Sequence, residues 1–488
     1  MIINITFRNL ITKKRSSLRR LCLLTLAALV FMLLYTLLRI LAPQPDTPFS
    51  PFLLGWIICF LPYFAVCIWI VRTRPLTGNG KWAELAIIFL GTLIFHLQLL
   101  SLPAGLSRDA WRYLWDAHAT IHGYSPYIYA PGDQILIPLR NILFEQSRYR
   151  NLVTNYPPGA QGFFLLGYLL SSTSLLGLKT VFLVCDLATS LALALLLIRK
   201  QLDPRKAVIY AWCPLPLVEF AVEGHVDVLV VMFTVLTLLC ASSNRSSMRI
   251  LAGIMLGMAT LSKLYPLILL AAVVQRRDWR LMCACALTIL LGYVPFLILG
   301  HGRALGFFLS FANQQGSNAG PIQLGVRWIS YGLQLKEASI LSLEHIVDGG
   351  VLGGAALLLL FLQNVRRIEP ETATLILLGL VVAMLPHVFP WYVTTIVPWI
   401  AIALSNTTTE AGGSGKKIAV LAGWSFTCTA VLSYIPAIEA LNTTPIWFCY
   451  YAFAYGPVLL GVSAAVVMWW LRTRRANLPG ANSDGSET

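Results

Sequence analysis

Apolar residues occur in runs of about 20 along nearly the whole chain, and short polar connections separate them. A helix of ~20 apolar residues is long enough to cross the ~30 Å hydrocarbon core of a bilayer. The pattern therefore predicts an all-α polytopic membrane protein, a bundle of about 13–14 transmembrane helices. The expected spans lie near residues 21–41, 52–71, 84–102, 178–198, 206–221, 227–242, 249–262, 263–275, 281–299, 345–363, 371–387, 391–405, 418–437 and 446–471.

Composition points to the same class of protein. Of the 488 residues, 57% are hydrophobic and 12% are charged, whereas a soluble domain has roughly 25% charged residues. The net charge of +15 would suggest nucleic-acid binding in a soluble chain, but most Lys and Arg residues lie in the short connections between apolar runs. We therefore expect a lipid bilayer and no nucleic acid as partner. The ten cysteines form no Cys-x-x-Cys pair and indicate neither a disulfide framework nor a zinc site.

Basic residues set the expected orientation. Residues 1–20 are basic, and the apolar run after them is too long for a signal-peptide core, which predicts a retained first span. Both termini are then cytoplasmic in a multi-pass protein of the cell (inner or plasma) membrane. A single transmembrane domain covers 21–475, and 476–488 form a disordered cytoplasmic tail. Seven basic connections fall on the cytoplasmic side: 72–81, 199–206, 245–249, 276–280, 366–367, 416–417 and 472–475.

This orientation requires two unusual segments. The apolar stretch 162–176 must lie on the outer surface without crossing, and 249–275 must be a pair of short helices that turn near Lys263. A competing count makes the first stretch a span and the second a single crossing. It places the basic connection 199–206 outside, against the positive-inside rule, so we prefer the first count.

Two long segments, 103–177 and 300–344, lie outside in the preferred count. Both are rich in Gly, aromatic and polar residues, so these extracytoplasmic loops are expected to carry the active site. The chain has no Walker-type phosphate loop and no long cytoplasmic loop that would hold a nucleotide. We therefore expect neither ATP nor a cytosolic nucleotide sugar as substrate.

A polar cluster follows the third expected span. If it is helical, four of its side chains lie at i, i+3, i+4 and i+7 on one face: Asp109, Arg112, Tyr113 and Asp116. Sugar transfer needs a base for the acceptor hydroxyl and cations for the departing phosphate, and this face offers both. The alternative is a surface helix whose acids and arginines pair with one another.

Further short motifs follow this cluster in order. Across roughly residues 84–405 the chain has Asp109-x-x-Arg112-Tyr113, Gly123-x-x-Pro126-Tyr127, Tyr156-Pro-Pro158, Glu223-Gly-His-Val-Asp227, Gly253-x-x-x-Gly257, Ser262-Lys-Leu-Tyr-Pro266 and Phe389-Pro-Trp-Tyr392. Together they resemble the GT-C glycosyltransferases, and most closely the bacterial polyprenyl-phosphate-mannose-dependent mannosyltransferases.

The resemblance implies a polyprenyl-phosphate-sugar donor reached from the bilayer and an outer-face glycolipid or glycan acceptor. It implies that Asp109 is the catalytic base and that Arg112 binds phosphate or carboxylate. Asp116 is expected to be the second catalytic carboxylate. Many relatives have Lys-Pro-Pro and an Asp-Glu pair where this chain has Tyr156-Pro-Pro and Asp109-Ala. No cofactor is therefore assigned, and the requirement for a divalent metal is left open. Tyr156 is still expected to bind the donor.

Several polar residues near expected span ends are further candidates. Glu223, His225 and Asp227 are expected to line the cavity with Tyr113 and Tyr127. Lys263 lies in an apolar stretch, where an ammonium is costly unless it meets water or an anion. We expect it to bind the donor phosphate; the alternatives are a lysine that snorkels at a helix end or a structural partner of Asp186.

Asp186 is expected to make a hydrogen bond or ion pair inside the bundle. The remaining candidates lie later in the chain. His387, Trp391 and Tyr392 are expected to shape the cavity. Arg303 and Arg327 either add cations for the donor phosphate or are solvated loop charges.

The function expected from these features is inverting transfer of a sugar, mannose by resemblance, with Asp109 as general base. A lipid-linked glycan flippase is one alternative, although the chain shows no obvious repeat of halves. An oligosaccharide polymerase or ligase is the other. It would favour Arg and His in a large late loop, whereas here the acids Asp109 and Asp116 come early and the late segment 300–344 is comparatively plain.

Overall fold

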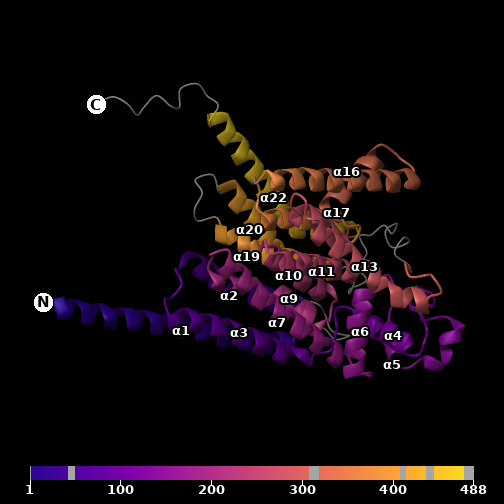
Figure 1. Ribbon diagram of the computed structural model, residues 1–488, viewed down its shortest axis with the longest axis horizontal. Coiled ribbons are helices and arrows are strands. Elements are labelled where there is room, and N and C mark those ends of the chain that lie inside the picture. Colours follow the sequence, from indigo (N-terminus) through magenta and orange to yellow (C-terminus); the bar gives the residue numbers. More distant parts are fainter. Residues whose placement is uncertain are drawn as a thin grey trace.

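The computed structural model describes residues 2–41, 50–306, 318–365, 367–406, 414–435 and 444–476. These residues form helices and connecting turns and contain no β-strand, which confirms the predicted all-α class. Apart from Ala476, the predicted tail 476–488 lies outside the described residues. In Figure 1, α1 and α3 lie side by side along the lower edge of the view.

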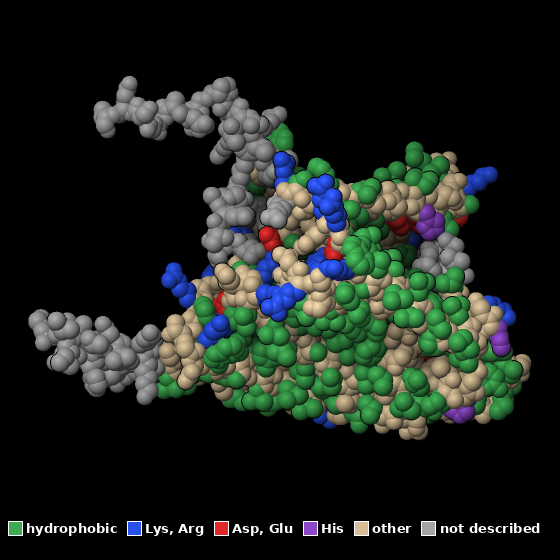
Figure 2. All heavy atoms as spheres, viewed as in Figure 1, with side chains coloured by type: hydrophobic (Ala, Val, Ile, Leu, Met, Phe, Trp, Pro, Cys, Tyr) green, Lys and Arg blue, Asp and Glu red, His purple; other side chains and the backbone are tan. Residues whose placement is uncertain are grey.

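Seven helices of the described chain are long and apolar enough to cross a membrane, by length and composition. They are Ser17–Ile40 within α1 (Ile2–Ile40), α2 (Ser50–Arg72), α3 (Asn79–Leu100), α7 (Leu176–Arg199), α13 (Trp279–Leu299), α16 (Glu337–Asn364) and Tyr450–Met468 within α22 (Thr444–Ala476). Their outward faces are apolar, and Figure 2 shows hydrophobic side chains over much of the visible surface.

Five shorter apolar helical stretches of 10–17 residues fall on further expected spans. They are α10 (Asp227–Ala241), α11 (Ser246–Ser262), α17 (Pro370–Met384), the stretch Pro390–Ser405 with α18 (Pro390–Val393) and α19 (Val397–Asn406), and the stretch Lys417–Ser433 with α20 (Ser414–Thr429). Together with the seven long helices they account for all but two of the expected spans. Several helices begin before their expected spans: the helix expected at 345–363 begins at Glu337, and the one expected at 84–102 begins at Asn79.

The expected span 206–221 is not one helix. It consists of a 3₁₀ turn (Pro204–Ala207), α8 (Val208–Ala211), α9 (Pro214–Leu217) and a π-helical turn (Val218–Val222). Pro214 and Pro216 remove backbone donors and break the helix. Irregular backbone is tolerated at membrane depth only when protein surrounds it. All of 204–222 is buried, among α2, α3, α7 and α19.

The segment 249–275 forms a hairpin that turns near Lys263, as expected, but its second arm is not one continuous helix. It contains most of α11, a 3₁₀ turn (Tyr265–Leu269) and α12 (Leu270–Val273), with the break at Lys263. Near the start of α11, Arg249 donates to the carbonyl of Val273 over 2.8 Å and pairs with Asp278. The two ends of the hairpin therefore lie at the same end of the bundle.

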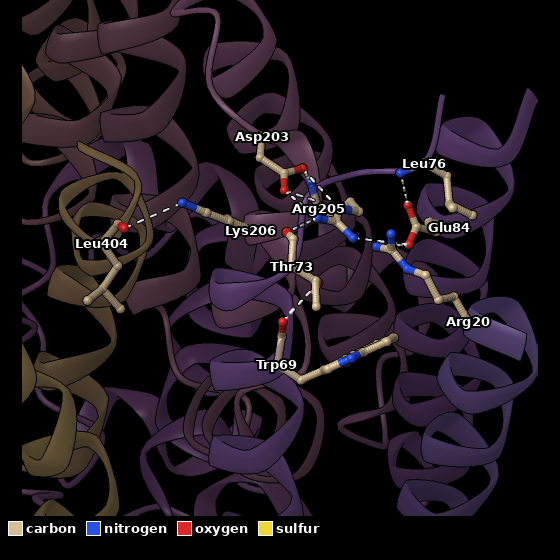
Figure 3. Close-up of polar contacts among 9 residues, drawn as sticks. All are labelled: Arg20, Trp69, Thr73, Leu76, Glu84, Asp203, Arg205, Lys206 and Leu404. Carbon is tan, nitrogen blue, oxygen red and sulfur yellow. Dashed lines mark hydrogen bonds and ion pairs between the residues drawn. The ribbon is translucent and has the colours of Figure 1, made fainter. Parts of the chain in front are cut away.

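A buried charge network decides between the two span counts (Figure 3). Glu84, near the start of α3, accepts hydrogen bonds from Arg20 over 2.9 Å and from Arg205 over 3.0 Å. Arg205 also donates to the carbonyl of Thr73 over 2.6 Å. The connection 199–206 thus lies at the same end of the bundle as the basic flank of α1. The competing count requires opposite ends, so the structure supports the preferred one. We call this the Arg205 end.

The apolar stretch 162–176 lies across the other end of the bundle, mostly in α6 (Pro158–Leu170). A Cβ at Gly159 would lie 2.7 Å from the Cβ of Leu261, and one at Gly167 would lie 2.7 Å from the Cα of Leu178. Leu261 ends α11 and Leu178 begins α7, both away from the Arg205 end. Both ends of α6 therefore stay at one end of the bundle.

Three helices of the segment 103–177 gather at this same end, which we call the Asp109 end. They are α4 (Asp109–Ile121), α5 (Ile142–Gln146) and α6, with a 3₁₀ turn at Gln134–Leu139 between α4 and α5 (Figure 1). Another helix, α15 (Pro321–Gly332), packs on α16 and α17. The Asp109 end thus carries most of the polar residues singled out in the sequence.

Candidate active site

Asp109 is the first residue of α4 and is partly exposed. Its backbone N–H lies 3.2 Å from the hydroxyl oxygen of Ser107, which accepts the hydrogen bond. Its carboxylate makes no hydrogen bond or ion pair with the described residues. A carboxylate that the fold does not use, at the first turn of a helix, is available to take a proton from a bound hydroxyl.

Arg112 and Asp116 pair with each other one turn further along α4. The Arg112 Nε lies 2.7 Å from the Asp116 carboxylate, and both side chains are buried. The remaining guanidinium nitrogens donate to the carbonyls of Tyr149 over 2.9 Å and Leu152 over 2.8 Å. The two residues therefore pair with each other, which was the alternative interpretation of this helix. This pairing does not support phosphate binding by Arg112 or catalysis by Asp116.

Glu223 fixes the turn that precedes Asp109. Its buried carboxylate accepts the backbone N–H groups of Gly105, Leu106 and Ser107 over 3.3, 3.0 and 2.9 Å. Three backbone donors held by one carboxylate make a rigid turn, because removal of the acceptor would leave all three unsatisfied. We expected Glu223 to line the cavity; the structure instead makes it a positioning residue for Asp109.

Lys263 is paired with Asp227. Its ammonium lies 2.8 Å from each carboxylate oxygen of Asp227, and it sits 4.1 Å from the ring centre of Tyr392. Asp227 is fully buried, whereas the Lys263 side chain is 13% exposed. The partner of Lys263 is therefore Asp227 and not Asp186. Asp186 contacts His96 over 2.7 Å and accepts from Tyr210, deep in the bundle, as expected of an internal pair.

Electrostatic contacts join these groups into one site. The charge of Asp109 acts on Lys263, on His225 and on the hydroxyl of Tyr392, so all three are close enough to this carboxylate to be influenced by its charge. Two tyrosines close the site on the α4 side: the hydroxyls of Tyr113 and Tyr156 lie 3.2 Å apart. Both hydroxyls also interact with Asp109 and Asp227. The site therefore contains an unpaired base beside a partly exposed cation and two phenols.

Stacked aromatic rings form one wall of the site. The His225 ring lies 3.9 Å from the Trp391 ring, and Trp391 lies 4.5 Å from Phe389. His387 continues the row, 6.2 Å from Phe389. His225 is fully buried and its Nδ1 lies 2.8 Å from the carboxylate of Glu219. These residues come together as expected, but His225 and Trp391 are buried and so support the wall from behind.

Other expected contributors lie outside this group. Tyr127 is buried and donates its hydroxyl to the carbonyl of Tyr156 over 2.7 Å, so it anchors the loop. Arg327 is buried and pairs with Glu344 over 2.5 Å. Arg303 is exposed, in agreement with a solvated loop charge. Within the described residues, no group of three or more His, Cys, Asp and Glu side chains is arranged to hold a metal ion.

Sequence reasoning missed three residues around the site. Glu219 lies in the π-helical turn and accepts the hydroxyl of Tyr434 over 3.0 Å. Tyr149 is exposed near Asp109 and has a left-handed backbone, φ +53°. A glutamate inside an apolar run is a signal that would have identified Glu219. No sequence pattern marks Tyr434 or Tyr149.

Residues 154–388 match glycosyltransferase family 87. The matched region includes Tyr156, the segment 223–227, Lys263 and His387, and it begins after Asp109. No curated protein matches the chain significantly. The match agrees with the GT-C resemblance of the sequence motifs and with the helical membrane fold. With this match and its helical membrane fold, the protein is a polytopic membrane glycosyltransferase of the GT-C type.

Proposed function

We propose that this glycosyltransferase moves a sugar from a polyprenyl-phosphate carrier to a glycolipid or glycan acceptor at the outer face of the cell membrane. The observation that carries the proposal is the unpaired carboxylate of Asp109 beside the partly exposed ammonium of Lys263. Base and cation lie at the end of the bundle, where a lipid phosphate would meet the protein from the bilayer surface. Mannose is the proposed sugar because the motif order resembles mannosyltransferases.

The proposed reaction is a single displacement. Asp109 accepts the proton of the acceptor hydroxyl while that oxygen attacks the anomeric carbon, and the bond from carbon to phosphate oxygen breaks on the opposite face. The anomeric centre is thereby inverted, and the lipid phosphate leaves with the bonding electrons. A lysine ammonium has three donors, so Lys263 can hold Asp227 and still donate to the phosphate. The hydroxyl pair of Tyr113 and Tyr156 offers one further donor for a phosphate oxygen, because the other O–H donates within the pair.

The donor class is tested with purified full-length protein in lipid nanodiscs. We expect sugar transfer from polyprenyl-phosphate-mannose to a lipid extract of the membrane that contains the protein, and no transfer from GDP-mannose. The measurement is radiolabel incorporation into glycolipid, with enzyme omitted as the control. Transfer from the nucleotide sugar would refute the proposed class of donor. A preference for polyprenyl-phosphate-glucose over polyprenyl-phosphate-mannose would refute the proposed sugar.

The orientation is tested by cysteine labelling in spheroplasts. Asn151 is exposed in the segment 103–177, and Gln201 is exposed at the Arg205 end. We expect N151C to react with an impermeant maleimide added outside, and Q201C to react only after lysis, because the positive-inside rule places the Arg205 end in the cytoplasm. The parent protein gives the background from its own cysteines. The reverse pattern would put the site in the cytoplasm.

A further inference from the structure

One exposed aromatic side chain at the site has no structural explanation. Tyr149 is 63% exposed and belongs to the loop between α5 and α6. Its φ of +53° is a left-handed conformation that costs free energy for a residue other than glycine. Such a conformation persists only where the surroundings impose it, and strained residues of this kind gather at functional sites.

The surroundings of Tyr149 do impose it. Its carbonyl accepts the guanidinium of Arg112 over 2.9 Å and the backbone N–H of Leu152 over 3.1 Å. The next carbonyl, that of Arg150, accepts the N–H of Gly132 over 2.7 Å. The backbone on both sides of the ring is thus bonded to α4 and to the neighbouring loop, while the ring itself is exposed.

The bond from Arg112 to the Tyr149 carbonyl holds this residue beside the helix that carries Asp109. The hydroxyl of Tyr149 interacts electrostatically with the carboxylate of Asp109 and with the hydroxyl of Tyr392, which stacks on Lys263. Arg112 lies one helical turn after Asp109 on α4, so the same helix sets the positions of the base and of this ring. A ring fixed relative to a general base is placed to position the molecule that the base deprotonates.

We propose that Tyr149 is the platform on which a pyranose ring of the acceptor stacks, with the attacked hydroxyl toward Asp109. The C–H face of a pyranose is apolar and packs on an aromatic ring, and the Tyr149 ring is the exposed apolar surface beside the base. The proposal rests on the proposed function, because it assigns the acceptor side of that reaction. A role in folding alone would not require an exposed ring in a strained conformation.

The test measures binding and transfer separately. Saturation-transfer-difference NMR of the full-length protein in nanodiscs, with methyl α-D-mannopyranoside as the probe, is expected to show binding to wild type. Y149F keeps the ring and should bind like wild type, whereas Y149A and Y149G should bind about tenfold more weakly, as expected for loss of one aromatic contact of about 1.4 kcal/mol. In the transfer assay, Y149A should raise the KM for acceptor about tenfold, with the KM for donor and kcat unchanged.

Matched variants separate recognition from folding. Y149G removes the strain, so its melting temperature should equal or exceed that of wild type while binding is lost. Gln201→Gly relieves a similar left-handed residue, φ +59°, at the Arg205 end, and Tyr331→Ala removes another exposed tyrosine, on α15. Neither control should change binding.

Two results would overturn the platform: equal binding of the glycoside by wild type and Y149A, or no binding by wild type. If binding depends on Tyr149 but no lipid-phosphate sugar is transferred, the platform stands and the proposed reaction fails.

Discussion

Asp109→Asn is expected to lower the rate of sugar transfer by ~10²–10⁴-fold, the usual loss on removal of a general base. Asparagine has nearly the same shape but takes no proton at neutral pH. The Asp109 carboxylate makes no hydrogen bond or ion pair within the described chain, so the variant should fold and melt like wild type. The measurement is kcat and the KM for donor of the purified protein, with polyprenyl-phosphate-mannose as donor.

Asp133→Asn is the matched control for this variant. Asp133 is exposed in the same segment, and its carboxylate accepts only the N–H of Ala130, which an asparagine oxygen can also accept. It should keep wild-type turnover. Wild-type turnover in Asp109→Asn would mean that the base lies elsewhere. Asp116 could not replace it without rearrangement, because it is buried against Arg112.

The helix that carries Asp109 was predictable, but the division of roles along it was not. The spacing of Asp109, Arg112 and Asp116 predicts one helix with a shared face, and α4 is that helix. The burial of Arg112 depends on the carbonyls of Tyr149 and Leu152, which lie 37 and 40 residues away in sequence. Helical periodicity contains no information about such a docked loop. The same limit applies to Glu223, whose three backbone donors lie far away in sequence.

The topology was predictable for a different reason. Positive charges mark one end of the bundle, and the connection 199–206 meets Arg20 through Glu84 as the charge pattern required. A break at Pro214 and Pro216 is visible in the sequence, but the division of 204–222 into two short helices and two turns was not expected. Apolar content alone does not distinguish a buried irregular segment from a helix that faces lipid, because both need side chains of the same kind.

Lys263→Met is expected to destabilise the protein by ~3–5 kcal/mol, the usual cost of removing one partner of a buried ion pair. The reason lies in Asp227, which is fully buried and has both carboxylate oxygens 2.8 Å from the ammonium. From the sequence alone, an unpaired Lys263 would be the costly charge and its removal would relieve strain. The observed pairing reverses that expectation, since the variant leaves a carboxylate without a cation.

The double variant Lys263→Met/Asp227→Asn separates stability from catalysis. It removes both charges, so it should recover most of the lost stability, and the difference from the two single variants gives the coupling free energy of the pair. Transfer should stay low in the double variant, with a raised KM for donor, because the cation proposed for the phosphate is still missing. Stability is measured by thermal unfolding of purified protein in one detergent, and activity with polyprenyl-phosphate-mannose.

Asp227→Asn alone removes the other partner of the ion pair. It leaves an ammonium that is partly exposed, stacks on Tyr392 and feels the charge of Asp109, so its cost should be smaller than that of Lys263→Met. If Lys263→Met melts like wild type, the buried pair does not persist in the membrane. If the double variant recovers both stability and a wild-type KM for donor, Lys263 serves the fold alone and the donor phosphate is held by other groups.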